Sequence, residues 1–151
     1  LYHDSFWYPT HQRIVHELLG SLSSQPDTAV GLLTGNLEPT ARLKLARFDL
    51  NPYFPFGAFA SDDENRNALV PIAVQRAEQH AGRSIGLGNH VVVIGDSPLD
   101  VACALAHGAT AVGVATGSYS AGELLAAGAH VAFDDLAATP SLVQTLSLLP
   151  L

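Results

Sequence analysis

The sequence has a single cysteine, few basic residues and no long apolar run, and each shortage excludes a class of protein. Cys103 cannot form an internal disulfide, and it lies among small apolar residues, so we expect a buried helix residue rather than a nucleophile. No run reaches the roughly 18 apolar residues that a membrane span needs. The first seven residues lack the basic and apolar regions of a signal peptide, which favours a cytoplasmic protein.

Charge narrows the set of partners. The chain has 7 Lys and Arg against 14 Asp and Glu, a formal net charge of −7. This balance argues against nucleic acid and membrane surfaces as partners, because both need a basic patch. A phosphorylated small molecule remains compatible, since a bound metal can supply positive charge locally. The seven histidines are scattered without ligand spacing, so a histidine-built zinc site is not expected.

The order of apolar segments predicts the fold class. With 151 residues and 48% hydrophobic content, the chain is long enough for one domain, residues 1–151, with a substantial core. Short apolar runs that indicate strands alternate with segments of helical spacing, which predicts an α/β fold: a Rossmann-like parallel sheet with helices on both faces. The predicted strands are residues 29–33, 58–60, 91–94, 111–115 and 129–133.

The most informative segment follows one of these strands. Four β-branched residues, 91–94, run into Gly95 and Asp96, and Asp100 follows four positions later. An unbroken apolar run predicts a strand buried on both faces, and ligands of such sheets bind beyond the carboxyl ends of the strands. Two carboxylates there suit a hard cation such as Mg²⁺. The alternative is that Asp96 merely caps the helix that begins near Pro98.

Two further segments carry polar groups suited to an anion. Thr34, Gly35 and Asn36 follow the strand at 29–33 and can hold an oxyanion with hydroxyl, amide and backbone donors. The alternative is a tight turn with a helix cap. Arg66 precedes a helix and can clamp a phosphate, or it can form a surface ion pair with the acidic residues at 62–64.

The order of these motifs resembles the haloacid dehalogenase (HAD) superfamily, in its phosphoglycolate-phosphatase-like branch. Leu33-Thr34-Gly35-Asn36 is similar to the second motif of that family, Arg66 to the third, and Ile94-Gly95-Asp96 with Asp100 to the fourth. The resemblance extends over residues 18–136. The third motif usually contains lysine, so Lys44 is the rival of Arg66, although its mid-helix position makes it less suited to the site.

The resemblance implies a role for each matching residue. Thr34 would hydrogen-bond the transferring phosphoryl group, with Gly35 and Asn36 assisting. Arg66 would neutralise negative charge. Asp96 would hold Mg²⁺, and Asp100 would position the metal shell or Arg66. Positioning and electrostatics of this kind supply most of the catalysis in phosphoryl transfer.

The chain departs from the family at the first motif, Asp-x-Asp, whose first Asp is the nucleophile and second the general acid/base. No such pair precedes Thr34, where the only aspartates are Asp4 and Asp27. Phe6 occupies the second carboxylate position after Asp4, and Asp27 falls in a turn. Residues 1–20 resemble the helix that follows a cap domain, so we expect a HAD-like core that is incomplete at its N-terminus and lacks both the first strand and the cap.

A missing first strand would leave two strands, those at 29–33 and 91–94, without a neighbour on one edge. Exposed edges invite pairing with another chain. Three options follow: residues 1–8 fill the slot, the two strands pair directly, or a second copy contributes, which would make a homodimer. The aromatic residues Tyr2, Phe6, Trp7 and Tyr8 suit either docking at such a place or packing under the following helix.

Two classes of function therefore stay open. The first is a HAD-type, Mg²⁺-dependent hydrolase of a small phosphate monoester, with a 2-haloacid dehalogenase as a variant. The second is a non-catalytic HAD core that binds phosphate, Mg²⁺ or a partner chain that carries the first motif. The absent Asp-x-Asp favours the second class, and Thr34, Asp96 and Asp100 favour descent from the first.

Overall fold

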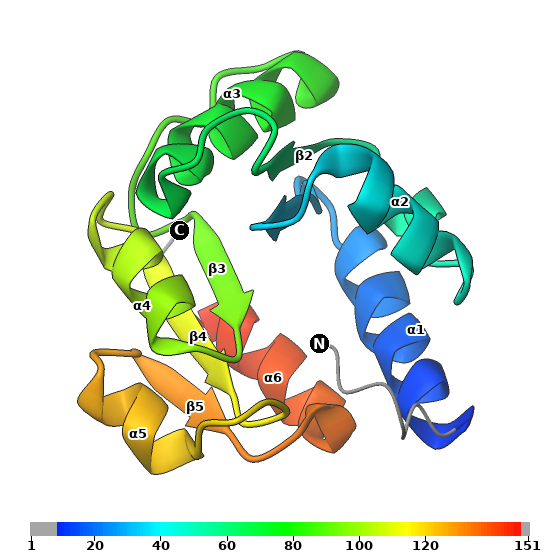
Figure 1. The fold of residues 1–151 in the computed structure, drawn as a ribbon. Helices are drawn as coiled ribbons and strands as arrows, with labels where there is room; N and C mark the ends of the chain where they lie inside the picture. The colour runs from blue at the N-terminus through cyan, green and yellow to red at the C-terminus, as the bar shows by residue number, and fades with distance from the viewer. Residues whose placement is uncertain (1–8, 149–151) are drawn as a thin grey trace. The chain divides into compact units, whose positions relative to one another are not determined.

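Five short strands alternate with six α-helices along residues 9–148, the part of the chain that the structure, a computed structural model, describes (Figure 1). The strands are β1 (Leu32–Thr34), β2 (Gly57–Phe59), β3 (Val92–Gly95), β4 (Thr110–Val114) and β5 (Val131–Phe133). The helices are α1 (Pro9–Ser23), α2 (Glu38–Ala46), α3 (Leu69–Ala81), α4 (Pro98–Leu105), α5 (Ala121–Ala126) and α6 (Thr139–Leu148).

All strand pairs are parallel, and they form two hydrogen-bonded sheets with the orders β1-β2 and β3-β4-β5. The predicted α/β class with parallel strands and helices on both sides is therefore confirmed. The chain divides into two compact units: residues 19–86, the β1–β2 unit, and residues 1–18 with 87–151, the β3–β5 unit. The prediction of a single domain over residues 1–151 stays a prediction.

The core of the β3–β5 unit lies between the sheet and two helices. Helices α4 and α5 pack on the strands, and Figure 1 shows α6 on the opposite face of this sheet. Every residue of β4 is buried because a strand flanks it on each edge. The buried cluster is built from small and medium apolar side chains: Val101, Ala104, Ala109, Ala111, Leu124 and Ala129.

The core of the β1–β2 unit is formed where α3 packs on β1 and β2. Buried residues of α3 recur at helical spacing, as an amphipathic helix requires: Leu69, Val70, Val74 and Ala77. The helix ends at Gly82, whose φ of 67° is the left-handed conformation that glycine adopts without strain.

One prediction about burial is wrong. The strand predicted at residues 91–94 is not buried on both faces: β3 is only half-buried, and Ile94 is 37% exposed. Strand β1 is likewise half-buried. An open edge alone is not the reason, because β2 also has a strand partner on one edge only among the described residues and is fully buried where α3 packs on it.

Some predictions lie outside the described residues. Asp4 and the aromatic residues at 2, 6, 7 and 8 belong to the segment 1–8, so the structure does not test them. No helix within residues 9–148 is long and apolar enough to cross a membrane.

Candidate functional site

The Thr34 loop, residues 34–36, joins the end of β1 to the start of α2. The Thr34 hydroxyl oxygen accepts two hydrogen bonds from Asn36, one from the backbone N and one from Nδ2, both at 3.1 Å. A hydroxyl has two acceptor positions and one proton. Both acceptor positions are filled here, so the remaining capacity of Thr34 is to donate its proton to an acceptor. The loop therefore has the chemistry of an anion site.

Two cations reach this loop from different elements. Arg66 begins a 3₁₀ turn, and its Nη1 would lie 3.7 Å from a Cβ added at Gly35, so the guanidinium stands beside the loop backbone. Lys44, on α2, donates from Nζ to Asn36 Oδ1 at 3.4 Å. The sequence made Lys44 a weaker candidate than Arg66 for the site, but the structure brings both to residues 34–36.

The acidic neighbours of Arg66 have partners of their own. Asp62 pairs with Arg76 through two contacts of 2.7 and 2.8 Å, and Asp63 Oδ1 accepts from the Asn65 N–H at 2.7 Å. The ion pair considered between Arg66 and Asp62 is thus replaced by the Asp62–Arg76 pair.

In the β3–β5 unit, Asp100 is fixed by the start of α4. Ser97 is the N-cap, with extended backbone, and its N–H and hydroxyl both donate to Asp100 Oδ2, at 3.1 and 2.8 Å. Asp100 N donates back to Ser97 Oγ at 3.4 Å, which completes a capping box. The alternative that Asp96 caps this helix is wrong, because Asp96 lies one residue too early. The pattern Ser-x-x-Asp was the signal for this cap.

Two glycines make room for the two carboxylates. A Cβ on Gly95 would collide with the side chain of Asp100. A Cβ on Gly117, in the loop after β4, would lie 2.7 Å from Asp96 Oδ2. Asp96 thus sits against the loop that follows the neighbouring strand, as expected when parallel strands end at one edge of a sheet.

The acidic residues of the β3–β5 unit suit Mg²⁺ better than a metal ion that is held by three or more protein side chains. Within residues 9–148, no group of three or more His, Cys, Asp or Glu side chains is arranged to hold a metal ion. Mg²⁺ is often held by one or two carboxylates and completed by water and phosphate oxygens. Asp96 and Asp100 are oxygen donors of the right type, so they fit Mg²⁺ bound in this way.

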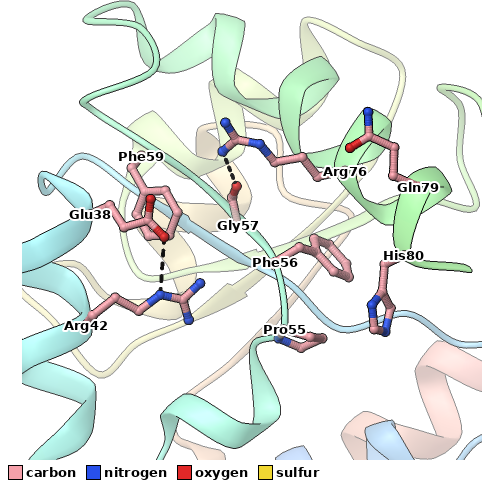
Figure 2. A pocket seen from close by; sticks show the side chains of 9 residues that line it. All are labelled: Glu38, Arg42, Pro55, Phe56, Gly57, Phe59, Arg76, Gln79 and His80. Atoms are coloured by element: carbon pink, nitrogen blue, oxygen red, sulfur yellow. Dashed lines mark hydrogen bonds and ion pairs between the residues drawn. The ribbon is translucent and has the colours of Figure 1, made fainter.

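A cavity of about 490 Å³ lies at the outer edge of β2 and contains none of the predicted site residues (Figure 2). Its two arginines are already engaged: Arg42 donates to the Phe54 carbonyl at 2.8 Å, and Arg76 donates to the Gly57 carbonyl at 2.6 Å. The cavity is therefore not the predicted phosphate site. The residues that line it are Glu38, Arg42, Pro55, Phe56, Gly57, Phe59, Arg76, Gln79 and His80.

Comparison with known proteins supports the fold assignment. Residues 67–139 match the family model described as HAD-hydrolase-like. The predicted resemblance to the HAD superfamily is confirmed, and the chain has a HAD-like hydrolase fold. The search of curated proteins found no match.

Solved structures share this fold at low sequence identity. A predicted phosphatase from Clostridium acetobutylicum aligns with a TM-score of 0.68 and 20% identity, over 86% of this chain and 58% of its own. A candidate beta-phosphoglucomutase from Thermotoga maritima gives 0.73 and 24%, over 87% and 58%. A HAD family hydrolase from Deinococcus radiodurans R1, with bound phosphate and sodium, gives 0.66 and 21%, over 90% and 60%. The chain thus spans about three fifths of the length of these structures.

Proposed function

We propose that this chain supplies the phosphate-binding and Mg²⁺-binding residues of a HAD-type phosphohydrolase that acts on a small phosphate monoester. The observation that carries the proposal is the Thr34 hydroxyl, whose two acceptor positions are filled by Asn36. Its proton is left to bind an oxyanion, and Arg66 beside Gly35 supplies positive charge. A phosphoryl group matches both features.

Each residue has a part in binding. Thr34 and the loop N–H groups would orient phosphoryl oxygens, and Arg66 would offset their negative charge. Asp96 would bind Mg²⁺, and Asp100, held by Ser97, would keep the start of α4 in place beside it. When bound, Mg²⁺ would supply positive charge and Lewis acidity at the Asp96 site.

A second candidate is binding without turnover. The observation that favours it is the absence of Asp-x-Asp from the 151 residues, since the nucleophile and general acid/base of HAD hydrolysis belong to that motif. In this case phosphate and Mg²⁺ bind, and chemistry requires a nucleophile from outside these 151 residues.

One pair of measurements tests both candidates. Hydrolysis of p-nitrophenyl phosphate is followed with and without Mg²⁺ for the wild type and Asp96→Asn, and the melting temperature is recorded at millimolar Mg²⁺. The control is Glu17→Gln, the same carboxylate-to-amide change at an exposed helix position paired with Arg13. We expect Mg²⁺ to raise the melting temperature of the wild type and the control by mass action, and not of Asp96→Asn.

The outcomes separate the candidates. Mg²⁺-dependent turnover that Asp96→Asn abolishes supports the hydrolase, and Asp4 is then the next residue to change. A rise in melting temperature with Mg²⁺, without turnover, supports binding alone. If Mg²⁺ raises the melting temperature of none of the proteins, the metal site in both proposals is contradicted.

A further inference from the structure

We propose that Lys44 sets the direction of the hydrogen bonds in the Thr34 loop and so keeps the Thr34 hydroxyl as a donor to a bound phosphoryl oxygen. Lys44 is then a positioning residue that acts through Asn36. The inference rests on the proposed function, because it takes phosphate as the ligand of the loop.

The argument begins at Asn36, whose side-chain amide has two orientations of nearly the same shape. One end of the amide donates and the other accepts. The end that faces Thr34 decides the role of the hydroxyl. If Nδ2 faces Thr34, the hydroxyl accepts and its proton is left for a ligand. If Oδ1 faces Thr34, that oxygen takes the hydroxyl proton.

Lys44 distinguishes these orientations. An ammonium group only donates hydrogen bonds, so its neighbour must present an acceptor. Lys44 Nζ lies 3.4 Å from Asn36 Oδ1, which turns the oxygen toward α2 and leaves Nδ2 to donate to Thr34 Oγ1 at 3.1 Å. The donors therefore run in one direction, from Lys44 through Asn36 to Thr34, and end at the ligand.

Loss of Lys44 removes the group that favours this orientation. With a neutral apolar side chain at position 44, the Asn36 amide is free to turn, and its Oδ1 competes with the ligand for the Thr34 proton. Arg66 differs, because its guanidinium stands beside Gly35 and acts on an anion through its own charge and donors. The effects of Lys44 and Thr34 on phosphate affinity should therefore be coupled, and those of Arg66 and Thr34 should be nearly independent.

A double-mutant cycle on inorganic phosphate affinity measures this coupling. Calorimetry gives the dissociation constant for the wild type, Thr34→Val, Lys44→Met and the double variant, and for Arg66→Gln with and without Thr34→Val. We expect Thr34→Val to weaken phosphate binding about tenfold in the wild type and in Arg66→Gln, the effect of one hydrogen bond to a charged group. In Lys44→Met, the same change should alter the affinity by less than about twofold. Lys44→Arg, which also only donates, should restore the tenfold effect.

A tenfold effect of Thr34→Val that persists in Lys44→Met would overturn the inference, because Lys44 would then act through its charge alone.

A second readout needs no ligand and covers variants that bind too weakly. The ¹H–¹⁵N resonances of the Asn36 side-chain amide should move in Lys44→Met and return in Lys44→Arg; unchanged resonances in Lys44→Met also overturn it. Wild-type protein that binds no phosphate contradicts the proposed function instead, and the Asn36 resonances still decide the role of Lys44. Circular dichroism melting confirms that each variant is folded.

Discussion

At the scale of single residues, the candidate metal site depends on two glycines that have no Cβ. Gly95 leaves the space that Asp100 occupies, and Gly117 leaves the space beside Asp96. Neither glycine has a positive φ, so backbone freedom is not the reason for glycine at these positions. The reason is the close approach of a carboxylate. These glycines therefore belong to the site as much as the aspartates do.

A test of this view is Gly117→Ala. The added Cβ would lie 2.7 Å from Asp96 Oδ2, and the short aspartate side chain must turn away to relieve the contact. We expect a small change in the melting temperature without metal, and loss of most of the rise that Mg²⁺ produces in the wild type. The measurement is thermal unfolding with and without millimolar Mg²⁺.

The matched control is Gly122→Ala, because glycine is replaced at a place where the nearest atom to an added Cβ is 3.9 Å away. This variant should keep the full Mg²⁺ response. An intact response in Gly117→Ala would mean that the position of Asp96 does not decide metal binding.

At the scale of elements, a side-chain pair completes the outer edge of β2. Strand β1 occupies one edge of β2. On the other edge, the Gly57 carbonyl accepts from Arg76 at 2.6 Å and the Phe59 N–H donates to Asp62 at 2.9 Å. Since Asp62 and Arg76 also bind each other, the pair satisfies backbone groups that would otherwise attract a further strand. Figure 2 shows the Arg76 contact with Gly57.

This pair makes stability depend on pH. The hydrogen bond from Arg76 lowers the pKa of Asp62 below its ordinary value of 3.8, and Asp62 raises the pKa of Arg76. A carboxyl with a lowered pKa in the folded state contributes stability that is fully present above its unfolded pKa. That contribution is lost as the pH falls below 3.8 and through the folded value.

Asp62→Asn should accordingly lower the free energy of unfolding by about 1 kcal/mol at pH 7, since the pair is partly exposed. The difference from wild type should shrink between pH 4 and pH 2, in urea unfolding at a series of pH values. Glu17→Gln, which breaks an exposed pair within α1, should cost less than about 0.5 kcal/mol. A difference for Asp62→Asn that stays constant down to pH 2 would show that the ionised pair is not its source.

At the scale of the whole molecule, β1 and β3 each lack a strand neighbour on one edge among the described residues. Both strands are apolar yet only half-buried, whereas β2 and β4 are fully buried. This is the situation predicted for a HAD-like core without its first strand. Apolar strands with an open edge are prone to pair with another chain.

We therefore expect self-association that depends on concentration. Multi-angle light scattering should show dimers, and Ile94→Lys should shift the protein toward monomer because it places a charge on the exposed face of β3. Leu125→Lys is the control, since Leu125 is 48% exposed on α5 and not on a strand edge. A monomer at all concentrations would rule out a second copy as the neighbour of these strands.

The sequence by itself determined the order of elements, the parallel α/β class and the HAD-like motifs. These depend on local signals: apolar runs, a glycine stop after α3, and polar residues directly after strands. The same signals brought Thr34 and Asn36 to one loop, because residues this close along the chain cannot separate far. Asp96 and Asp100 were likewise placed on one strand exit.

Only the tertiary structure decided the contacts between residues far apart in the chain. Burial of β1 and β3 depends on what packs against them, which an apolar run cannot reveal. The approach of Gly117 to Asp96 and of Arg76 to β2 depends on how helices and loops pack against strand ends. Such contacts leave no periodic pattern in the sequence, because each joins two segments whose separation along the chain is set by the fold.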